Sequence, residues 1–259
     1  MSTTELPTTG RFVWYELVTE DKNKALDFYR ALFGWNVHEE DMGEMGTYPM
    51  VGVGETWLAG LVSPRQEGIP AHWIAYVTVP DVDAAARKTE ELGGKVHVPP
   101  TDIPNVGRFT AISDPQGATI LPFKFASQNP PEMEGPPPAG FFCWNELLTS
   151  DPEAGGKFYQ EIFGWSLTSA DLGEMGTYYM FQRGQKEEAG AMKMPPQAEA
   201  PPHWLPYISV DDVDASVQKC QELGGMVYCQ PTNIPNVGRF AVMADPLGAT
   251  FAVFKGPTT

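Results

Sequence analysis

The sequence predicts an α+β protein built from two similar domains, because it repeats itself and contains many short strands but few helices. Residues 11–48 match residues 141–178 without gaps at an offset of 130, with 18 of 38 positions identical. Residues 72–124 match residues 203–255 at an offset of 131, with 30 of 53 positions identical. Each amphipathic helix is accompanied by four short strand-like segments, a pattern typical of helices that pack on one face of a sheet.

A proline-rich segment separates the two copies. The string ASQNPPEMEGPPPAG at residues 126–140 contains five prolines and has no hydrophobic periodicity, as expected of a stiff, exposed linker. The copies on either side have the usual size of a domain. We therefore predict a first domain at residues 8–125, a linker at 126–139 and a second domain at 140–257.

The first half of each copy reads as strand, helix and three strands. In the first copy, residues 11–19 are rich in β-branched and aromatic residues and predict a strand. Asp21 is placed to cap a helix that Gly34 ends. The helix is indicated by apolar residues at spacings of three and four, namely Ala25, Phe28, Tyr29, Leu32 and Phe33. Three strands are expected after it, near residues 35–40, 46–53 and 57–63.

The second half of the copy restarts the same scheme. Residues 72–79 predict a strand, and Asp81 is placed to cap a helix at residues 82–92. The string Asp-Pro-Gln-Gly at 114–117 fits a type I turn between two strands. The expected strands lie near residues 95–98, 107–113 and 117–124, so the chain reads as βαβββ four times.

Composition excludes several classes of protein. Seventeen basic against 33 acidic residues give a net charge of −16, the wrong sign for a nucleic-acid-binding protein. No run of about 18 apolar residues predicts a membrane-spanning helix, and the start of the chain does not resemble a signal peptide. Three cysteines without a CxxC pair indicate reduced thiols. We expect a cytoplasmic protein without nucleic-acid or membrane partners.

Several repeated motifs resemble one protein family. The strings FYRALFGW and FYQEIFGW follow a first strand, HWIAYVTVPDVDAA begins the second half, and DPxGAT joins the last two strands. In this order they resemble the vicinal oxygen chelate superfamily, which includes glyoxalase I, bleomycin-resistance proteins, fosfomycin-resistance enzymes and extradiol dioxygenases. With GEMGTY and IPNVGRF, the chain is most similar to bacterial tandem two-domain glyoxalase-like proteins, often labelled hydroxylases. The resemblance implies that two βαβββ modules form a curved, cup-shaped mixed sheet whose concave face holds a ligand.

The resemblance also implies where a divalent metal would be bound. Family enzymes place a His or Gln on a first strand, seven residues before the helix-capping aspartate, and a Glu on a last strand. In this sequence the corresponding residues are apolar or glycine, and their side chains cannot ligate a hard cation. They are Trp14, Ile74, Trp144 and Leu205 on first strands, Leu121 and Ala252 on last strands, and residues in the stretches 60–62 and 190–192. We expect no cofactor at these positions, so a divalent metal would need displaced ligands.

Polar residues still lie on the predicted concave face. Strand alternation places Glu16 beside Trp14, and His72 in line with Tyr76, on that face. The second copy repeats the set as Trp144, Glu146, His203 and Tyr207. The candidate catalytic residues are Glu16, His72, Glu146 and His203. The candidate ligand-binding residues are Trp14, Tyr76, Arg108, Leu121, Trp144, Tyr207, Arg239 and Ala252.

The glutamate allows three interpretations. Glu16 could bind a displaced metal with His72, act as a general base if burial raises its pKa, or pair with a buried cation. Arg108 of IPNVGRF is the predicted cation in the first copy, and Arg239 is predicted to reach Glu146 in the second. The same arginines could instead bind an anionic ligand. His72 could equally well cap the start of its strand.

Three functions are consistent with these residues. The first is a glyoxalase/bleomycin-resistance-like protein that binds a small organic molecule in apolar cups without the usual metal site. The second is a metal-dependent lyase, isomerase or oxygenase that uses Glu16 with His72 and Glu146 with His203 as displaced ligands. The third is an interaction scaffold with vestigial pockets. The protein is expected to be a monomer with an internal pseudo-twofold axis or a homodimer.

Overall fold

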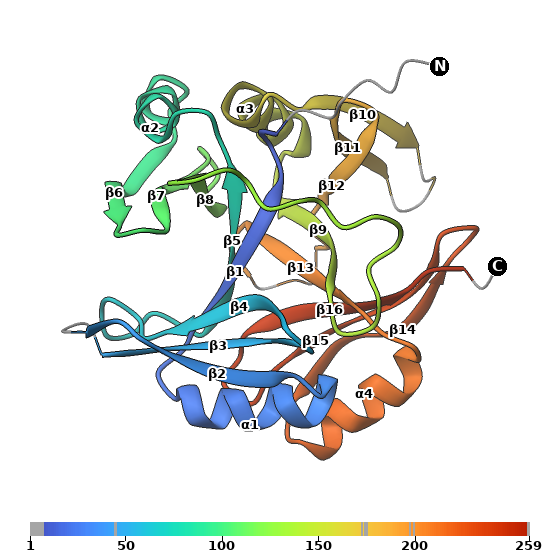
Figure 1. Cartoon of the computed structure of the whole chain (residues 1–259). Coiled ribbons are helices and arrows are strands. Elements are labelled where there is room, and N and C mark those ends of the chain that lie inside the picture. The colour runs from blue at the N-terminus through green and yellow to red at the C-terminus, as the bar shows by residue number, and fades with distance from the viewer. Residues whose placement is uncertain are drawn as a thin grey trace. The chain divides into compact units, whose positions relative to one another are not determined.

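The chain forms four βαβββ modules in two eight-stranded sheets. A computed structural model describes residues 8–43, 46–171, 173, 176–196, 198 and 200–257. Figure 1 shows the modules in chain order from blue to red. Since each module has one helix and four short strands, the predicted α+β class is confirmed.

The elements follow the predicted order. The first module contains β1 (Phe12–Val18), α1 (Lys22–Phe33), β2 (Asn36–Asp41), β3 (Thr47–Val53) and β4 (Thr56–Val62). The second contains β5 (His72–Thr78), α2 (Val82–Glu91), β6 (Lys95–Ile103), β7 (Gly107–Ser113) and β8 (Thr119–Phe125). The third contains β9 (Phe142–Thr149), α3 (Pro152–Phe163), β10 (Ser166–Asp171), β11 (Thr177–Arg183) and β12 (Lys186–Lys193). The fourth contains β13 (His203–Ser209), α4 (Val213–Glu222), β14 (Met226–Ile234), β15 (Gly238–Ala244) and β16 (Thr250–Lys255).

Both sheets are mixed and have the same strand order. The first runs β2-β3-β4-β1-β5-β8-β7-β6 and the second β10-β11-β12-β9-β13-β16-β15-β14. The first strand of each module pairs in parallel with the last strand of that module, and the hairpins between are antiparallel. Register shifts along β6–β7 and β14–β15 mark bulges, which bend the strands.

The helices begin and end at the residues that the sequence indicates. Asp21, Asp81, Asp151 and Asp212 each accept a hydrogen bond from the backbone N–H three residues later. Gly34 and Gly164 end α1 and α3 in the left-handed conformation that glycine adopts at little cost. No helix in the described part of the chain is long and apolar enough to cross a membrane.

The compact units of the structure do not coincide with the two sequence copies. Unit 1 contains residues 1–14, 75–132 and 144–204, and unit 2 contains residues 15–74, 133–143 and 205–259. Unit 1 therefore combines most of the second module with most of the third, and unit 2 combines most of the first with most of the fourth. The domain boundaries at 8–125 and 140–257 stay a prediction from the repeat.

The core of unit 1 is built from both copies. Helix α2 packs against α3, as Figure 1 shows, and the strands of both modules contribute apolar side chains. The buried cluster includes Val77, Ile112 and Ile120 from the first copy and Leu147, Tyr159, Trp165 and Phe181 from the second. Tyr159 of α3 donates a hydrogen bond to the backbone carbonyl of Ala118, in the turn after Asp114, at 3.1 Å.

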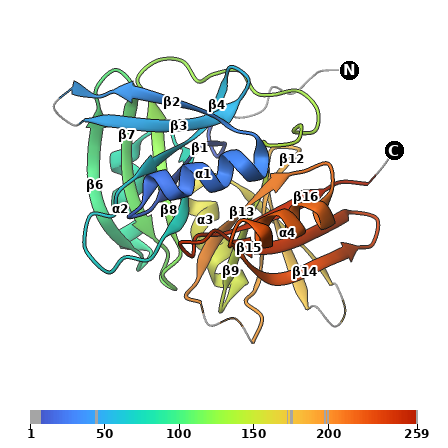
Figure 2. The same ribbon diagram turned by 90° about the horizontal axis from the view of Figure 1, so that it is seen from below.

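Unit 2 is built in the same way. Helix α1 lies beside α4, which is clearest in Figure 2. The hydroxyl of Tyr29, on α1, donates to Oδ2 of Asp245 at 3.2 Å and accepts from Nε1 of Trp73 at 2.9 Å. Oδ1 of Asp245 accepts backbone N–H groups of Leu247 and Ala249, so this aspartate both shapes its turn and binds a helix of the other copy.

Candidate functional site

A glutamate and a tyrosine form a hydrogen-bonded pair in the first module. Glu16 lies on β1, and Tyr48 lies at the start of β3. The tyrosine Oη donates to Oε1 of Glu16 at 2.8 Å. The pair joins two strands that are separated by β4 in the sheet, so both side chains lie on the same face. Within GEMGTY, Glu44 and Met45 lie outside the described residues.

The third module repeats the pair and adds a tryptophan. Oη of Tyr178 donates to Oε1 of Glu146 at 2.9 Å and accepts from Nε1 of Trp144 at 3.1 Å. Glu146 is buried, with 7% of its surface exposed. Burial, and then the nearby Glu146 carboxylate, raise the pKa of Tyr178, so the phenol keeps its proton at neutral pH. A continuous donor chain therefore runs from the indole through the phenol to the carboxylate.

A glycine under each tyrosine makes room for the pair. Gly60 on β4 is the strand partner of Glu16, and Gly190 on β12 is the partner of Glu146. A Cβ atom placed on either glycine would lie 1.9 Å from the hydroxyl oxygen of the tyrosine. Any other residue at these positions would push the hydroxyl away from the carboxylate. The glycines thus permit the Tyr–Glu hydrogen bond.

The same glycines bear on the metal that the family resemblance implies. They lie in the stretches 60–62 and 190–192, where the resemblance places a ligand, and the space above them is filled by tyrosine hydroxyls. In the part of the chain that the structure describes, no group of three or more His, Cys, Asp or Glu side chains could hold a metal ion. The residues present therefore do not fit the family's usual metal.

The two candidate histidines bind the backbone at the starts of their strands. Nδ1 of His72 lies 2.8 Å from the carbonyl oxygen of Pro70, and Nδ1 of His203 lies 2.8 Å from that of Pro201. Burial lowers the pKa of His203, which favours the neutral ring. These contacts support the interpretation of both histidines as strand-start residues. The proposed displaced metal ligands gain no third partner among the described residues.

The predicted partners of the two arginines were wrong. Nε and Nη2 of Arg108 donate to the two oxygens of Asp83 at 2.8 and 3.0 Å, and Nη1 donates to Asp102 at 2.8 Å. Arg239 makes the same contacts with Asp214 and Asn233. Asp83 and Asp214 lie in the first turns of α2 and α4, so both guanidinium groups lie on the helix side of the sheet. The reason is strand alternation: the neighbouring Phe109 packs near Tyr76 on the opposite face.

The second and fourth modules carry aromatic side chains on the face of Tyr76 and Tyr207. The ring of Tyr76 lies 6.1 Å from Phe109 and 5.8 Å from Phe123, and the ring of Tyr207 lies 6.3 Å from Phe240. The candidate residues Leu121 and Ala252 are buried strand partners of these tyrosines. These residues are therefore part of the buried, mainly apolar interior.

The sequence alone did not identify Tyr48, Tyr178, Gly60 and Gly190 as site residues. The available indication was the repeat itself, since the Glu, Tyr and Gly residues recur together at an offset of 130. Burial raises the pKa of the Cys143 thiol to about 12, which favours an unreactive thiol.

Comparison with known proteins identifies the family. The family described as Glyoxalase/Bleomycin resistance protein/Dioxygenase superfamily matches residues 11–121 and 143–253. The chain is 36% identical over 246 residues to a protein named "Putative glyoxylase CFP32" from Mycobacterium bovis, covering 93% of each chain. It is 31% identical over 261 residues to the "Anthracycline biosynthesis protein DnrV" of Streptomyces peucetius, covering 95% of this chain and 93% of the relative.

Solved structures share the fold at low sequence identity. A variant of homoprotocatechuate 2,3-dioxygenase from B. fuscum superposes with a TM-score of 0.65 and 17% identity, covering 99% of this chain and 74% of the dioxygenase. The 2,2',3-trihydroxybiphenyl 1,2-dioxygenase of Sphingomonas wittichii strain RW1 gives 0.64 and 14%, covering 98% and 92%.

The matched regions cover most of both sequence copies. The paired βαβββ modules are the architecture that the resemblance implied, and the relatives are similar over nearly their full length. The chain therefore belongs to the Glyoxalase/Bleomycin resistance protein/Dioxygenase superfamily.

Proposed function

We propose that this protein binds a hydroxylated aromatic small molecule at its Glu–Tyr pairs, without a metal at the family's usual positions. The observation that carries the proposal is the donor chain from Trp144 through Tyr178 to Glu146. A buried carboxylate that accepts a hydrogen bond from a phenol is a strong acceptor, and it suits a ligand that donates hydroxyl groups.

The charge of the site argues against an anionic ligand. The two arginines that could have bound an anion are held by Asp83 and Asp214 on the helix side. A ligand carboxylate or phosphate would instead meet the carboxylates of Glu16 and Glu146, in a chain of net charge −16. A neutral phenol or catechol meets no such repulsion.

The names of several relatives and structural neighbours refer to aromatic compounds, which supports an aromatic ligand. One is an anthracycline biosynthesis protein, and the solved structures include dioxygenases named for homoprotocatechuate and trihydroxybiphenyl. The indole of Trp144, hydrogen-bonded to Tyr178 beside Glu146, would add apolar contact for such a ring.

Ligand titration of matched variants tests the proposal. Binding of 1,8-dihydroxyanthraquinone, with unsubstituted anthraquinone as the comparison ligand, would be followed by tryptophan fluorescence and calorimetry. We expect Glu146→Gln and Tyr178→Phe each to weaken binding of the hydroxylated compound about tenfold or more, since a hydrogen bond to a charged group contributes about 1.5–3 kcal/mol. Glu16→Gln and Tyr48→Phe test the first module in the same way.

Arg108→Met is the control, because its guanidinium lies on the helix side of the sheet. Its affinity should stay within twofold of the native protein. If all variants bind as the native protein does, or if neither anthraquinone binds, the proposal is wrong and an interaction scaffold becomes the better interpretation. Native mass spectrometry of the purified protein would test the metal-dependent alternative, which requires stoichiometric divalent metal.

A further inference from the structure

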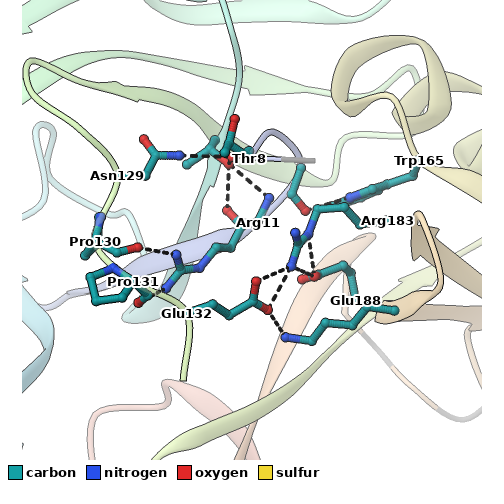
Figure 3. Close-up of polar contacts among 12 residues, drawn as sticks. Thr8, Arg11, Asn129, Pro130, Pro131, Glu132, Trp165, Arg183 and Glu188 are labelled. Carbon is teal, nitrogen blue, oxygen red and sulfur yellow. Dashed lines mark hydrogen bonds and ion pairs between the residues drawn. The ribbon is translucent and has the colours of Figure 1, made fainter. Parts of the chain in front are cut away.

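A buried ion network ties the linker to unit 1, as Figure 3 shows. The side chain of Arg183, at the end of β11, is 3% exposed, and that of Glu188 on β12 is 6% exposed. Nε of Arg183 donates to Glu188 at 2.7 Å, and its Nη2 donates to the two oxygens of the linker residue Glu132 at 2.8 and 2.7 Å. Lys186 also binds Glu132.

Glu132 balances the charge of this network. Its carboxylate binds two cations, the buried Arg183 and the exposed Lys186, while Glu188 binds Arg183 alone among the ion pairs described. Buried charges are tolerated only when they are paired and hydrogen-bonded. The buried Arg183 of the β11–β12 hairpin therefore has both of its carboxylate partners only when the linker lies on the hairpin.

Residues just before Glu132 are held at a second point. Nη1 and Nη2 of Arg11 donate to the carbonyl oxygens of Pro130 and Pro131 at 2.6 and 2.9 Å. Nδ2 of Asn129 donates to the carbonyl of Thr8 at 3.0 Å. Linker residues 129–132 thus join the start of the first copy to the β11–β12 hairpin of the second copy, and all of these contacts lie within unit 1.

The matched positions of unit 2 are apolar. At the offset of 130, Arg11, Arg183 and Glu188 correspond to Phe141, Val53 and Leu58. Gln116 makes a further polar contact between the copies, because its Oε1 accepts hydrogen bonds from the hydroxyl of Thr149 and the N–H of Asp151. At the offset of 131, the residue that corresponds to Gln116 is the apolar Leu247. At these matched positions, the residues that lie between the two copies are polar or charged in unit 1 and apolar in unit 2.

We propose that the Arg183–Glu188–Glu132 network is a clasp that fixes the linker on unit 1 and selects which modules of the two copies pair. All four modules share one fold, so exchanged pairings compete with the native one. An exchanged pairing would place the Arg183–Glu188 pair against Phe141, or the Arg11 guanidinium against Val53 and Leu58. These charged groups would then lose Glu132 and the linker carbonyls that they bind here. Exchange of modules between two chains would also require residues 129–132 to leave their contacts.

A double variant that gives unit 1 the residues of unit 2 tests the clasp. Arg183→Val with Glu188→Leu replaces the buried pair by apolar side chains of the kind that fold at the matched positions. We expect the folded variant to be cleaved in residues 126–139 by proteinase K at least tenfold faster than the native protein. After refolding at increasing protein concentration, light scattering should detect an added species of twice the native mass, which the native protein does not form.

Lys157→Gln is the control, since it breaks an exposed ion pair with Glu153 on α3 of the same unit. It should change neither readout. Unchanged linker cleavage and an unchanged mass distribution in the double variant would overturn the proposal. If the double variant fails to fold, Glu132→Gln tests the proposal instead, because it keeps the Arg183–Glu188 pair. Linker cleavage at the native rate in Glu132→Gln would equally overturn the proposal.

Discussion

At the scale of single residues, the site depends on two glycines that have no side chain to fill the space of the tyrosine hydroxyls. Tyr48 and Tyr178 reach their glutamates because Gly60 and Gly190 have no side chain. At the positions where the family resemblance places a metal ligand, this chain has glycines, which leave room for the Tyr–Glu hydrogen bond. The polar chemistry of the face is then that of a phenol and a carboxylate.

Gly190→Ala should therefore both destabilise the protein and weaken ligand binding. The added Cβ would lie 1.9 Å from the hydroxyl of Tyr178, so the ring must move and the bond to Glu146 must break. Overpacking of this kind costs about 1–3 kcal/mol, measurable by urea denaturation. Gly256→Ala, whose Cβ would meet its nearest neighbour at 3.9 Å, should have almost no effect. Equal stability of the two variants would contradict this account.

Buried Asp245 gives a second residue-scale prediction. Burial raises the pKa of Asp245 in the folded state, so its contribution to stability is greatest below its unfolded pKa and is lost as pH rises through the folded pKa. Compared with the native protein, Asp245→Asn should become relatively more stable between about pH 4 and pH 7. Denaturation at several pH values gives this difference.

Asp214→Asn provides a control of opposite sign. The Arg239 guanidinium lowers the pKa of Asp214, so the stability from this group is present above its unfolded pKa and is lost as pH falls. The Asp214→Asn variant should become relatively less stable as pH rises toward about 4, the unfolded pKa of aspartate, and its stability relative to the native protein should then stay nearly constant up to pH 7. The same trend in both variants would show that burial does not govern Asp245.

Strand alternation in the sequence predicted the faces of the first strand of the site, but it was not applied to the strand that carries Arg108. It placed Glu16 and Trp14 on one face and the core residues Tyr15 and Leu17 on the other, and both core residues are buried. Applied to Arg108, the same rule would have placed it opposite Phe109, on the helix side. The hydroxyl of Tyr48 could not be located because the sequence does not give the path of the GEMG turn.

At the scale of elements, local signals fixed the helices well and the edge strands less well. Each helix begins after an aspartate that accepts a backbone N–H, as predicted. Strand β6 contains Pro99 and Pro100 and extends to residue 103, beyond the predicted end near residue 98. An edge strand tolerates prolines because one side of it needs no ladder hydrogen bonds, and β6 lies at the edge of its sheet.

Loss of a helix cap should have a local and predictable cost. Asp81→Ala removes the acceptor for the N–H of Ala84, and such caps contribute about 1 kcal/mol. Asp81→Ser keeps an acceptor and should recover most of the loss in thermal denaturation. A serine variant as unstable as the alanine variant would mean that Asp81 acts through something other than the cap.

At the scale of the whole molecule, each hydrophobic core is formed by residues of both sequence copies. Unit 1 needs residues 75–132 and 144–204, and unit 2 needs residues 15–74 and 205–259. The repeat in the sequence predicted four modules, but their near-identity could not show which modules share a core. Which modules pair depends on a few side chains where the two copies meet. The hydrophobic pattern that all four modules share does not distinguish these side chains.

Separate halves of the chain should therefore fail to fold alone. We expect residues 1–132 and residues 133–259, each purified alone, to lack cooperative thermal unfolding and near-ultraviolet dichroism. Mixed and refolded together, they should recover both signals, because the two halves then supply each other's missing core. Independent cooperative folding of either half would contradict the unit assignment.

The hydrogen bond between Tyr29 and Asp245 spans 216 positions of the chain. A ribosome that has made the first copy has produced α1 but not α4 and β16, which complete the burial of its apolar face in unit 2. At a synthesis rate of about 5–20 residues per second, that face waits roughly 10 s or more for the last module to emerge. During this interval the nascent chain exposes Phe28 and Tyr29 to its surroundings, so its yield in the cell should depend on chaperones that bind nascent apolar segments.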